Sequence, residues 1–509
     1  MDSSPPPPAP TVAPATSRRH LSFHNHQIRA LVLTFIAYAS FHASRKPPSI
    51  VKSVLAPDPS STTSSSGAGW PPFDGDRGPH RLGELDLVFL SSYSAAMYLS
   101  GHAADRLDLR CFLAAGMIGS CIATAAFGLA FWLDVHRLWF FVAVQVASGL
   151  VQSIGWPCVV AVVTNWFSDS SNRGLIMGVW NSQTSVGNII GSVLASAVLN
   201  FGWGWSFVIP SILIGLTGVL VLFFLVAHPR DLLIQSMDSE VELNVAASAA
   251  VDDDVMIEDL NGRNSQFSEE IGLLRPGFSL TEGKELPIGF FDAWRVPGVA
   301  PYAFSLFFSK LVAYTFLYWL PFYIRHTAVA GEHPTHRASG ILSTVFDIGG
   351  VLGGVSAGFI SDWLSARAIT SVMFLLLSVP ALIFYRIYGS ISMSFNICLM
   401  FLSGFFVNGP YSLITTAVAA DLGTQDIIKG NSRALATITA IIDGTGSVGA
   451  ALGPLLTGYI STRGWNNVFM MLIISNSLAI MCLIHLAKAE ITSKRNQGMG
   501  SINIDAEGL

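Results

Sequence analysis

Five charged residues lie well inside long apolar stretches of this sequence, away from the ends of the stretches, and these residues are the best placed to do chemistry. They are Arg45, Lys46, Lys310, Asp347 and Asp443. A cation held at the depth of the bilayer centre costs about 2.5–3.5 kcal/mol on insertion scales, so it needs an anion, a polar cavity or a route to the headgroups. Arg45 and Lys46 could reach the outer headgroups, because Pro47 and Pro48 end the helix beside them. They could equally line a polar interior.

Two of these cations suggest an anion-binding site. Arg45 lies in the first apolar stretch of the chain, and Lys310 lies in the first apolar stretch after a long polar break. If both face one cavity they could hold a phosphate ester, since arginine binds two phosphate oxygens with its planar fork while lysine acts as a point charge. The alternative is that Arg45 or Lys310 forms an internal ion pair with Asp443 or Asp347. Asp443 could also serve only as a hydrogen-bond acceptor in helix packing.

The composition is that of a membrane protein with many spans. Hydrophobic residues make up 51% of the 509 residues and charged residues only 12%, and the mean hydropathy is +0.52. Soluble domains carry about 25% charged residues. The sequence holds no zinc, phosphate-loop or dinucleotide motif, and no nucleophile and base at matching depth. We therefore expect no metal, no cofactor and no enzymatic reaction.

Twelve apolar stretches are long enough to cross a bilayer as helices, which takes about 20 residues each. The first six are expected at 27–55 (kinked at its prolines), 85–104, 111–133, 138–166, 174–199 and 207–227. The second six are expected at 298–324, 339–360, 369–387, 395–420, 434–460 and 468–486. We predict an all-α membrane protein with two pseudo-symmetric six-helix bundles, at 27–227 and 298–487.

The segments outside the two bundles are polar. We expect a disordered tail at 1–26 and a second tail at 488–509. The segment 228–297 has fourteen acidic against four basic residues between positions 228 and 292, so it is expected to be a largely disordered acidic linker rather than a partner-binding segment. Lysine and arginine are enriched in the loops on the side of the termini, so the positive-inside rule places both termini in the cytoplasm. The pattern fits the plasma membrane and the endoplasmic reticulum equally.

A short motif recurs in the connections that follow the second and the eighth stretch. Its members are Gly101, Asp105, Arg106 and Arg110 in the first copy and Gly358, Asp362 and Arg367 in the second. We expect the glycine to permit close helix approach, the aspartate to face a neighbouring helix N-terminus and the arginines to hold the loop. The repeat resembles the inner-loop signature of the major facilitator superfamily. That resemblance implies two bundles that rock about a central pathway.

Several separated motifs resemble one family within that superfamily. They are Tyr38-x6-Arg45-Lys46, Gly155-Trp156-Pro157, Asn165-Trp166-Phe167, Trp180-Asn181 and Ala440-Ile441-Ile442-Asp443-Gly444. Together they are similar to the organophosphate:phosphate antiporters, and most similar to the eukaryotic sugar-phosphate exchangers, which include plant glycerol-3-phosphate permeases. The resemblance implies exchange of glycerol 3-phosphate or a sugar phosphate for inorganic phosphate by alternating access.

The same resemblance implies roles for individual residues. Arg45 would be a phosphate ligand, Lys310 a second cation, and Tyr38 a hydrogen-bond donor that lines the cavity. The other residues expected at the substrate site are Lys46, His42, Tyr93, Trp180, Asn181, Gln183 and Tyr314. Bacterial members carry a lysine where Met97 stands and a histidine where Thr184 stands, so His42 and Gln183 are expected to substitute in part.

An electrostatic argument connects two such cations with exchange. An empty site with two unpaired cations would resist closing, because burying uncompensated charge is costly, and a phosphate with about −1.5 to −2 charges would neutralise it. One alternative is a proton-coupled symporter of a sugar or an anion, with Asp347 or Asp443 as the titrating acid. Another is a sensor that binds phosphate esters without transporting them. The expected partners are the phosphate ester, inorganic phosphate and the lipid bilayer, with no nucleic acid and no obligatory protein partner.

Overall fold

The computed structural model describes residues 15–57, 69–104, 106–167, 179–229, 231, 290–418, 422 and 432–507. In these residues the chain is helical apart from short connections and one isolated bridge between Val329 and Glu332. Most of the predicted acidic linker lies outside the described residues, as does Asp105 of the repeated motif. The predicted all-α architecture is therefore confirmed for the described part of the chain.

The first half of the chain forms six helical rods. Their helices are α1 (Ala15–Arg45), α2 (Pro47–Leu55), α3 (Gly78–Ala104), α4 (Leu109–Leu129), α5 (Leu138–Gln152), α6 (Gly155–Phe167), α8 (Gln183–Val198) and α9 (Trp205–Phe224). The predicted kink in the first stretch lies at Lys46, between α1 and α2. Pro47 and Pro48 open α2, where the missing backbone N–H costs no hydrogen bond, so the rod bends and then continues.

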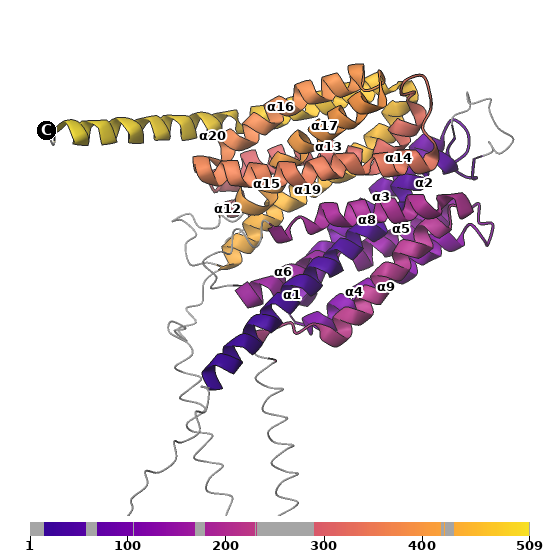
Figure 1. Cartoon of the computed structure of the whole chain (residues 1–509), viewed down its shortest axis with the longest axis horizontal. Helices are drawn as coiled ribbons and strands as arrows, with labels where there is room; N and C mark the ends of the chain where they lie inside the picture. The colour runs from indigo at the N-terminus through magenta and orange to yellow at the C-terminus, as the bar shows by residue number, and fades with distance from the viewer. Residues whose placement is uncertain are drawn as a thin grey trace, which may run out of the picture. The chain divides into compact units, whose positions relative to one another are not determined.

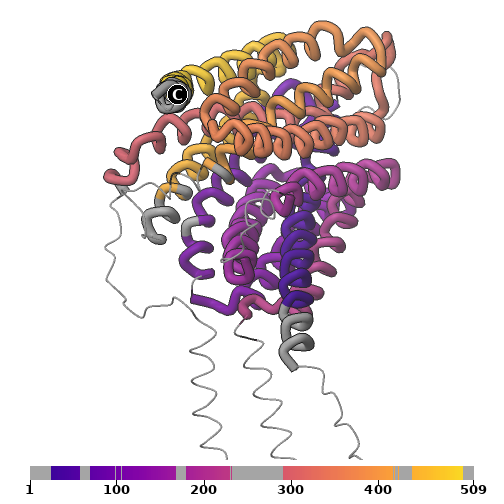
Figure 2. The backbone as a smooth tube through the Cα atoms, turned by 60° about the vertical axis from the view of Figure 1, so that its left-hand side comes forward, coloured from indigo at the N-terminus to yellow at the C-terminus, as the bar shows by residue number. Residues whose placement is uncertain are grey.

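The second half repeats this arrangement. Its helices are α12 (Phe290–Arg295), α13 (Val299–His326), α14 (His336–Leu342), α15 (Thr344–Leu364), α16 (Arg367–Tyr388), α17 (Met393–Leu413), α19 (Ser432–Ile460) and α20 (Trp465–Glu507). Figure 1 shows α13 to α20 gathered above the helices α1 and α4 to α9, and Figure 2 shows the same separation from another direction. The two halves thus form two groups of helices, as the sequence predicted.

Nine helical segments in the described part are long and apolar enough to cross a membrane. The other three predicted spans correspond to α1, α3 and α19, which have 31, 27 and 29 residues and exceed the length of about 20 that a crossing needs. Two boundaries differ from the prediction, since residues 15–26 and 488–507 are helical where tails were expected. Extending an existing helix needs no new nucleation step, so both spans continue into their polar flanks.

Contacts between the two halves concentrate at one end of the helices, which we call the distal end and define by α2, the start of α3 and the start of α14. An apolar cluster there combines Ile50 and Phe89 of the first half with Trp319 and Phe322 of the second half. Ser49 Oγ donates a hydrogen bond of 3.0 Å to the Leu317 carbonyl across the same boundary. The distal end is therefore closed by buried contacts.

Glycines set the distance between key helix pairs. A side chain on Gly449 of α19 would overlap the backbone oxygen of Phe307 on α13, and one on Gly353 of α15 would overlap that of Phe405 on α17. These glycines therefore allow close packing of α13 against α19 and of α15 against α17.

Candidate functional site

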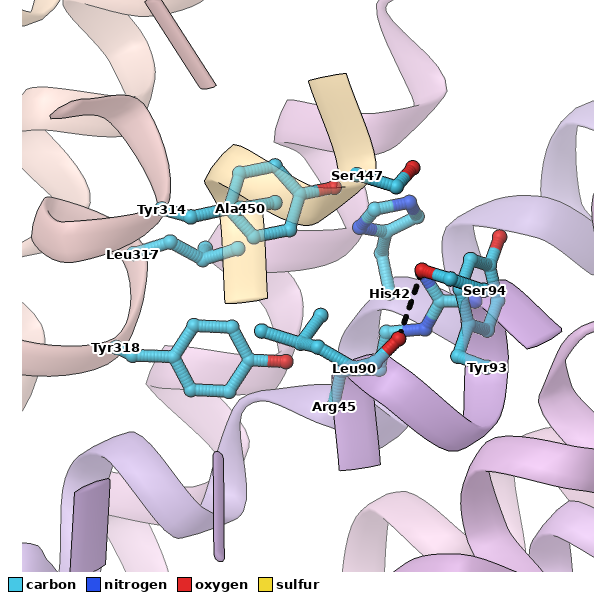
Figure 3. A pocket seen from close by; sticks show the side chains of 10 residues that line it. All are labelled: His42, Arg45, Leu90, Tyr93, Ser94, Tyr314, Leu317, Tyr318, Ser447 and Ala450. Carbon is cyan, nitrogen blue, oxygen red and sulfur yellow. Dashed lines mark hydrogen bonds between the residues drawn. The ribbon is translucent and has the colours of Figure 1, made fainter. Parts of the chain in front are cut away.

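A small cavity lies between the two halves, and residues of both halves line it (Figure 3). The lining residues are His42, Arg45, Leu90, Tyr93 and Ser94 of the first half and Tyr314, Leu317, Tyr318, Ser447 and Ala450 of the second. The cavity volume is about 10 Å³. A water molecule needs about 10–15 Å³ by this measure, so the cavity must widen before any phosphate ester can enter.

Arg45 is the charged residue of this cavity. Its Nε donates a hydrogen bond of 2.6 Å to Gln152 Oε1. Its guanidinium lies over the Tyr93 ring, 4.6 Å from the ring centre, and Figure 3 shows both residues in the lining of the cavity. Its Nη2 atom is buried and has no hydrogen-bond partner. Within the described residues, ion pairs join other cations to carboxylates but none involves Arg45. Arg45 therefore offers an uncompensated positive charge to the cavity.

Lys310 is paired, which corrects the expectation of two unpaired cations. Its Nζ lies 2.6 Å from Asp443 Oδ1, and both side chains are largely buried. The pair forms because α13 and α19 approach closely through glycine, so that Gly446 lies against the Lys310 side chain. Tyr314, which lines the cavity, lies one helical turn from Lys310 on α13. Lys310 thus lies near the cavity without lining it.

Lys46 is also paired and does not reach the outer headgroups. Its Nζ lies 3.4 Å from Asp347 Oδ2 of the second half and donates to the Leu317 carbonyl at 3.4 Å. Asn188 Nδ2 donates to the other Asp347 oxygen at 3.5 Å, and Asn188 Oδ1 lies 3.2 Å from His42 Nδ1. The headgroup interpretation is therefore wrong. This network connects the cavity, through His42, with the boundary between the halves.

A third buried ion pair had not been predicted. Only 1% of Lys52 is exposed, and its Nζ donates to Asp86 Oδ2 at 2.6 Å and to the Tyr318 carbonyl at 3.1 Å. The ammonium also lies 4.8 Å from the centre of the Trp319 ring. The available signal was Asp86, an acidic residue inside a predicted span.

The other predicted site residues do not line the cavity. Tyr38 is buried and packs on Trp156, with ring centres 5.2 Å apart. Trp180 Nε1 donates to Thr34 Oγ1 at 3.1 Å, and Asn181 Nδ2 contacts Ser412 Oγ at 3.5 Å across the two halves. The Gln183 side chain is buried, and its amide has no hydrogen-bond partner. The structure thus brings His42, Arg45, Tyr93 and Tyr314 together, and adds Ser94, Tyr318 and Ser447, which had not been predicted.

The glycines of the repeated loop motif do not have the packing role that was expected of them. A side chain on Gly101 or Gly358 would meet nothing within 4 Å, so these glycines do not serve close helix approach here. Arg367 donates to Ser361 Oγ at 2.9 Å and pairs with Asp362 of its own loop. Arg106 is exposed and Arg110 is partly exposed. Arg367 therefore holds the connection between α15 and α16, which contains the second copy of the motif.

The chain thus has two halves of membrane-length helices and, between them, a cavity lined by Arg45. This is the arrangement of a membrane carrier. Residues 34–427 match the Major Facilitator Superfamily, and the chain belongs to this superfamily. It is 60% identical to "Putative glycerol-3-phosphate transporter 5" of Arabidopsis thaliana, with 96% of each chain covered. It is 44% identical to "Glucose-6-phosphate exchanger SLC37A2" of Danio rerio, with 95% of this chain and 96% of that one covered.

A solved structure resembles the fold. It is the crystal structure of a bacterial homolog of the human lysosomal transporter Spinster, in an inward-facing and unoccupied conformation. The TM-score is 0.61 with 15% sequence identity, covering 92% of this chain and 97% of that one. This likeness concerns the fold alone. The predicted fold and family are confirmed, and the chain is a multi-pass membrane transporter rather than an enzyme.

Proposed function

We propose that this chain exchanges glycerol 3-phosphate or a sugar phosphate for inorganic phosphate by alternating access. The observation that carries the proposal is Arg45, whose buried Nη2 has no partner in a cavity between the two halves. Relatives named for glycerol 3-phosphate and glucose 6-phosphate support the same class of substrate. A phosphate ester fits the unpartnered Arg45 Nη2 as well as the names of these relatives, because its charged oxygens accept hydrogen bonds from a guanidinium.

Arg45 binds the phosphate group in this proposal. A guanidinium can donate two parallel hydrogen bonds to phosphate, and hydrogen bonds to charged groups contribute about 1.5–3 kcal/mol each. Hydroxyl groups of Tyr93, Tyr314, Tyr318 and Ser447 line the same cavity and suit the polyol part of the substrate. One residue thus recognises the charge, while several hydroxyls contact the remainder.

Lys310 supplies the second positive charge after the phosphate displaces Asp443. A phosphate dianion carries more charge than Arg45 alone can neutralise, and Lys310 lies one helical turn from the cavity residue Tyr314. The requirement for exchange follows from Arg45. Closing the empty carrier would bury an unpaired cation, whereas closing it around either phosphate compound would not.

Movement of the halves gives access to each side in turn. Both termini lie in the cytoplasm in this proposal, in accord with the lysine and arginine bias, so the closed distal end faces outward. Opening that end must separate Lys46 from Asp347 and Ser49 from the Leu317 carbonyl. A protein tag on either terminus should accordingly be accessible only after the membrane is permeabilised.

Counterflow in liposomes tests this function. Purified protein is reconstituted with internal unlabelled phosphate, and uptake of labelled phosphate is measured against external glycerol 3-phosphate, glucose 6-phosphate, glycerol and sulfate. Exchange that needs internal phosphate, and that phosphate esters but not glycerol inhibit, is the expected result. Uptake that follows a pH gradient without internal phosphate would instead support the proton-coupled alternative. Binding of esters without any flux would support a sensor.

A further inference from the structure

We infer that Gln152 is the residue that positions Arg45 for anion binding while leaving its charge uncompensated. This inference rests on the proposed function and adds a positioning residue to the same site. Gln152 is the last residue of α5, and only 1% of it is exposed. Gln152 is neutral and does not line the cavity proposed for the substrate, so it acts through its contact with Arg45.

Hydrogen bonds fix the orientation of the Gln152 amide. Its Oε1 accepts from Arg45 Nε at 2.6 Å, while its Nε2 lies 3.2 Å from Ser148 Oγ and 3.5 Å from Ser44 Oγ. Arginine can only donate, so the amide oxygen must face it and the amide nitrogen must face the two serines. The amide is therefore held from both ends.

The same contacts fix the guanidinium. Gln152 holds one edge through Nε, and the Tyr93 ring covers one face at 4.6 Å from its centre. Nη2 stays buried without a partner. A guanidinium held by its Nε keeps both terminal nitrogens available for two parallel bonds to phosphate oxygens. Gln152 thus orients the fork before substrate arrives.

The hydrogen-bond partner of Arg45 is neutral, whereas the partners of the other buried cations are negatively charged. In the described part of the chain Lys46, Lys52 and Lys310 each lie 2.6–3.4 Å from a carboxylate. Arg45 is held by an amide instead. A carboxylate at position 152 would have nearly the same shape but would cancel the charge that the phosphate needs. The Gln152 amide therefore orients the Arg45 guanidinium without neutralising its charge.

A second cavity lies beside Arg45 and is lined by both polar and apolar side chains. It has a volume of about 20 Å³, enough for about one water molecule, and Ser44, Thr124, Gln145, Ser148 and Gln152 contribute polar groups to its lining. These five residues belong to the first half, and Tyr318 adds a lining residue from the second half. Because Gln152 and Arg45 move together when the halves rock, their contact persists in every state, unlike the Lys46–Asp347 pair between the halves.

Three variants test the inference in full-length protein reconstituted in liposomes. Gln152→Glu should raise the phosphate concentration for half-maximal exchange at least ten-fold, with the maximal rate changed less than two-fold. Gln152→Met removes the orienting bond but keeps the charge available, so it should raise this concentration several-fold. Gln145→Glu places the same new carboxylate two helical turns away in the same cavity and should have the smallest effect.

The outcomes separate this inference from the proposed function. Wild-type protein that does not exchange phosphate would defeat the proposed function whatever the variants do. Active wild-type protein with unchanged half-saturation in Gln152→Glu would overturn the role of Gln152. An equal loss of folded protein and maximal rate in Gln152→Glu and Gln152→Met, at unchanged half-saturation, would show a merely structural role and would also overturn it. If Gln152→Glu does not insert, the half-saturation of Gln152→Met decides.

Discussion

Removing the Lys52–Asp86 pair should open the distal end of the carrier without unfolding it. The double variant Lys52→Met with Asp86→Leu replaces a fully buried ion pair by apolar side chains of similar volume. Such replacements are often neutral or stabilising by about 1–4 kcal/mol, because the desolvation cost of both charges disappears. Stability of the first half should therefore be kept.

The double variant also loses the contacts that Lys52 makes with the second half, and their contribution to the closed state can be estimated. Lys52 donates to the Tyr318 carbonyl and lies over the Trp319 ring, and both partners belong to the second half. A charged hydrogen bond contributes about 1.5–3 kcal/mol and a cation–π contact about 0.5–1 kcal/mol or more. The lower sum is about 2 kcal/mol, which corresponds to a roughly 30-fold increase in the ratio of open to closed distal ends.

Spin labels across the distal end measure this ratio. Phe201 and Arg337 are exposed and lie on opposite halves there, so cysteines at both positions in a background free of native cysteines can carry the labels. Double electron–electron resonance should show a longer-distance population that grows in the double variant. A folded variant with an unchanged distance distribution would refute the reasoning that Lys52 holds the halves together.

Three further predictions concern the partners of the charges and the packing. Asp443→Asn frees Lys310 and should lower the half-saturating phosphate concentration while slowing maximal exchange, measured by counterflow; unchanged kinetics would exclude Lys310 from the site. Lowering the pH from 7.5 to 5.5 should raise the half-saturating concentration of glycerol 3-phosphate about four-fold, since a phosphate-ester pKa near 6 leaves less dianion; a flat pH profile would contradict recognition of the dianion. Gly449→Leu should abolish folded protein on size exclusion, because its side chain would overlap the Phe307 backbone, whereas Gly358→Ala, whose added carbon would meet nothing within 4 Å, should retain it.

Helices and their order could be predicted because they depend on local sequence. Apolar length marks a span, and a proline pair marks the kink at Lys46. The partner of each charge could not be predicted, because it depends on helix rotation. Arg45 and Lys46 are neighbours in sequence, yet successive helical residues point about 100° apart, so one reaches the cavity and the other reaches Asp347.

Residues without charge were the hardest to find. Gln152 is a neutral residue within an apolar stretch, and its position beside Arg45 follows from the packing of α5 against the other helices. The pairing of Lys52 was not predicted either, because it depends on how α2 packs against α3 and the second half. The sequence indicated Lys310 and Asp443 as a possible pair. Whether Lys310 pairs with Asp443 or stays unpaired beside Arg45 depends on the close contact of α13 and α19, which the sequence does not give.

Direct binding of phosphate to Arg45 variants tests the central claim. Labelled phosphate is titrated into purified wild-type protein, Arg45→Gln, Arg45→Lys and the exposed control Arg137→Gln. Two hydrogen bonds to a charged group at about 1.5 kcal/mol each correspond to a loss of more than 100-fold in Arg45→Gln. We predict an intermediate loss in Arg45→Lys, which keeps the charge without the fork, and wild-type affinity in the control. Folded Arg45→Gln protein that binds phosphate as tightly as the wild type would contradict the account.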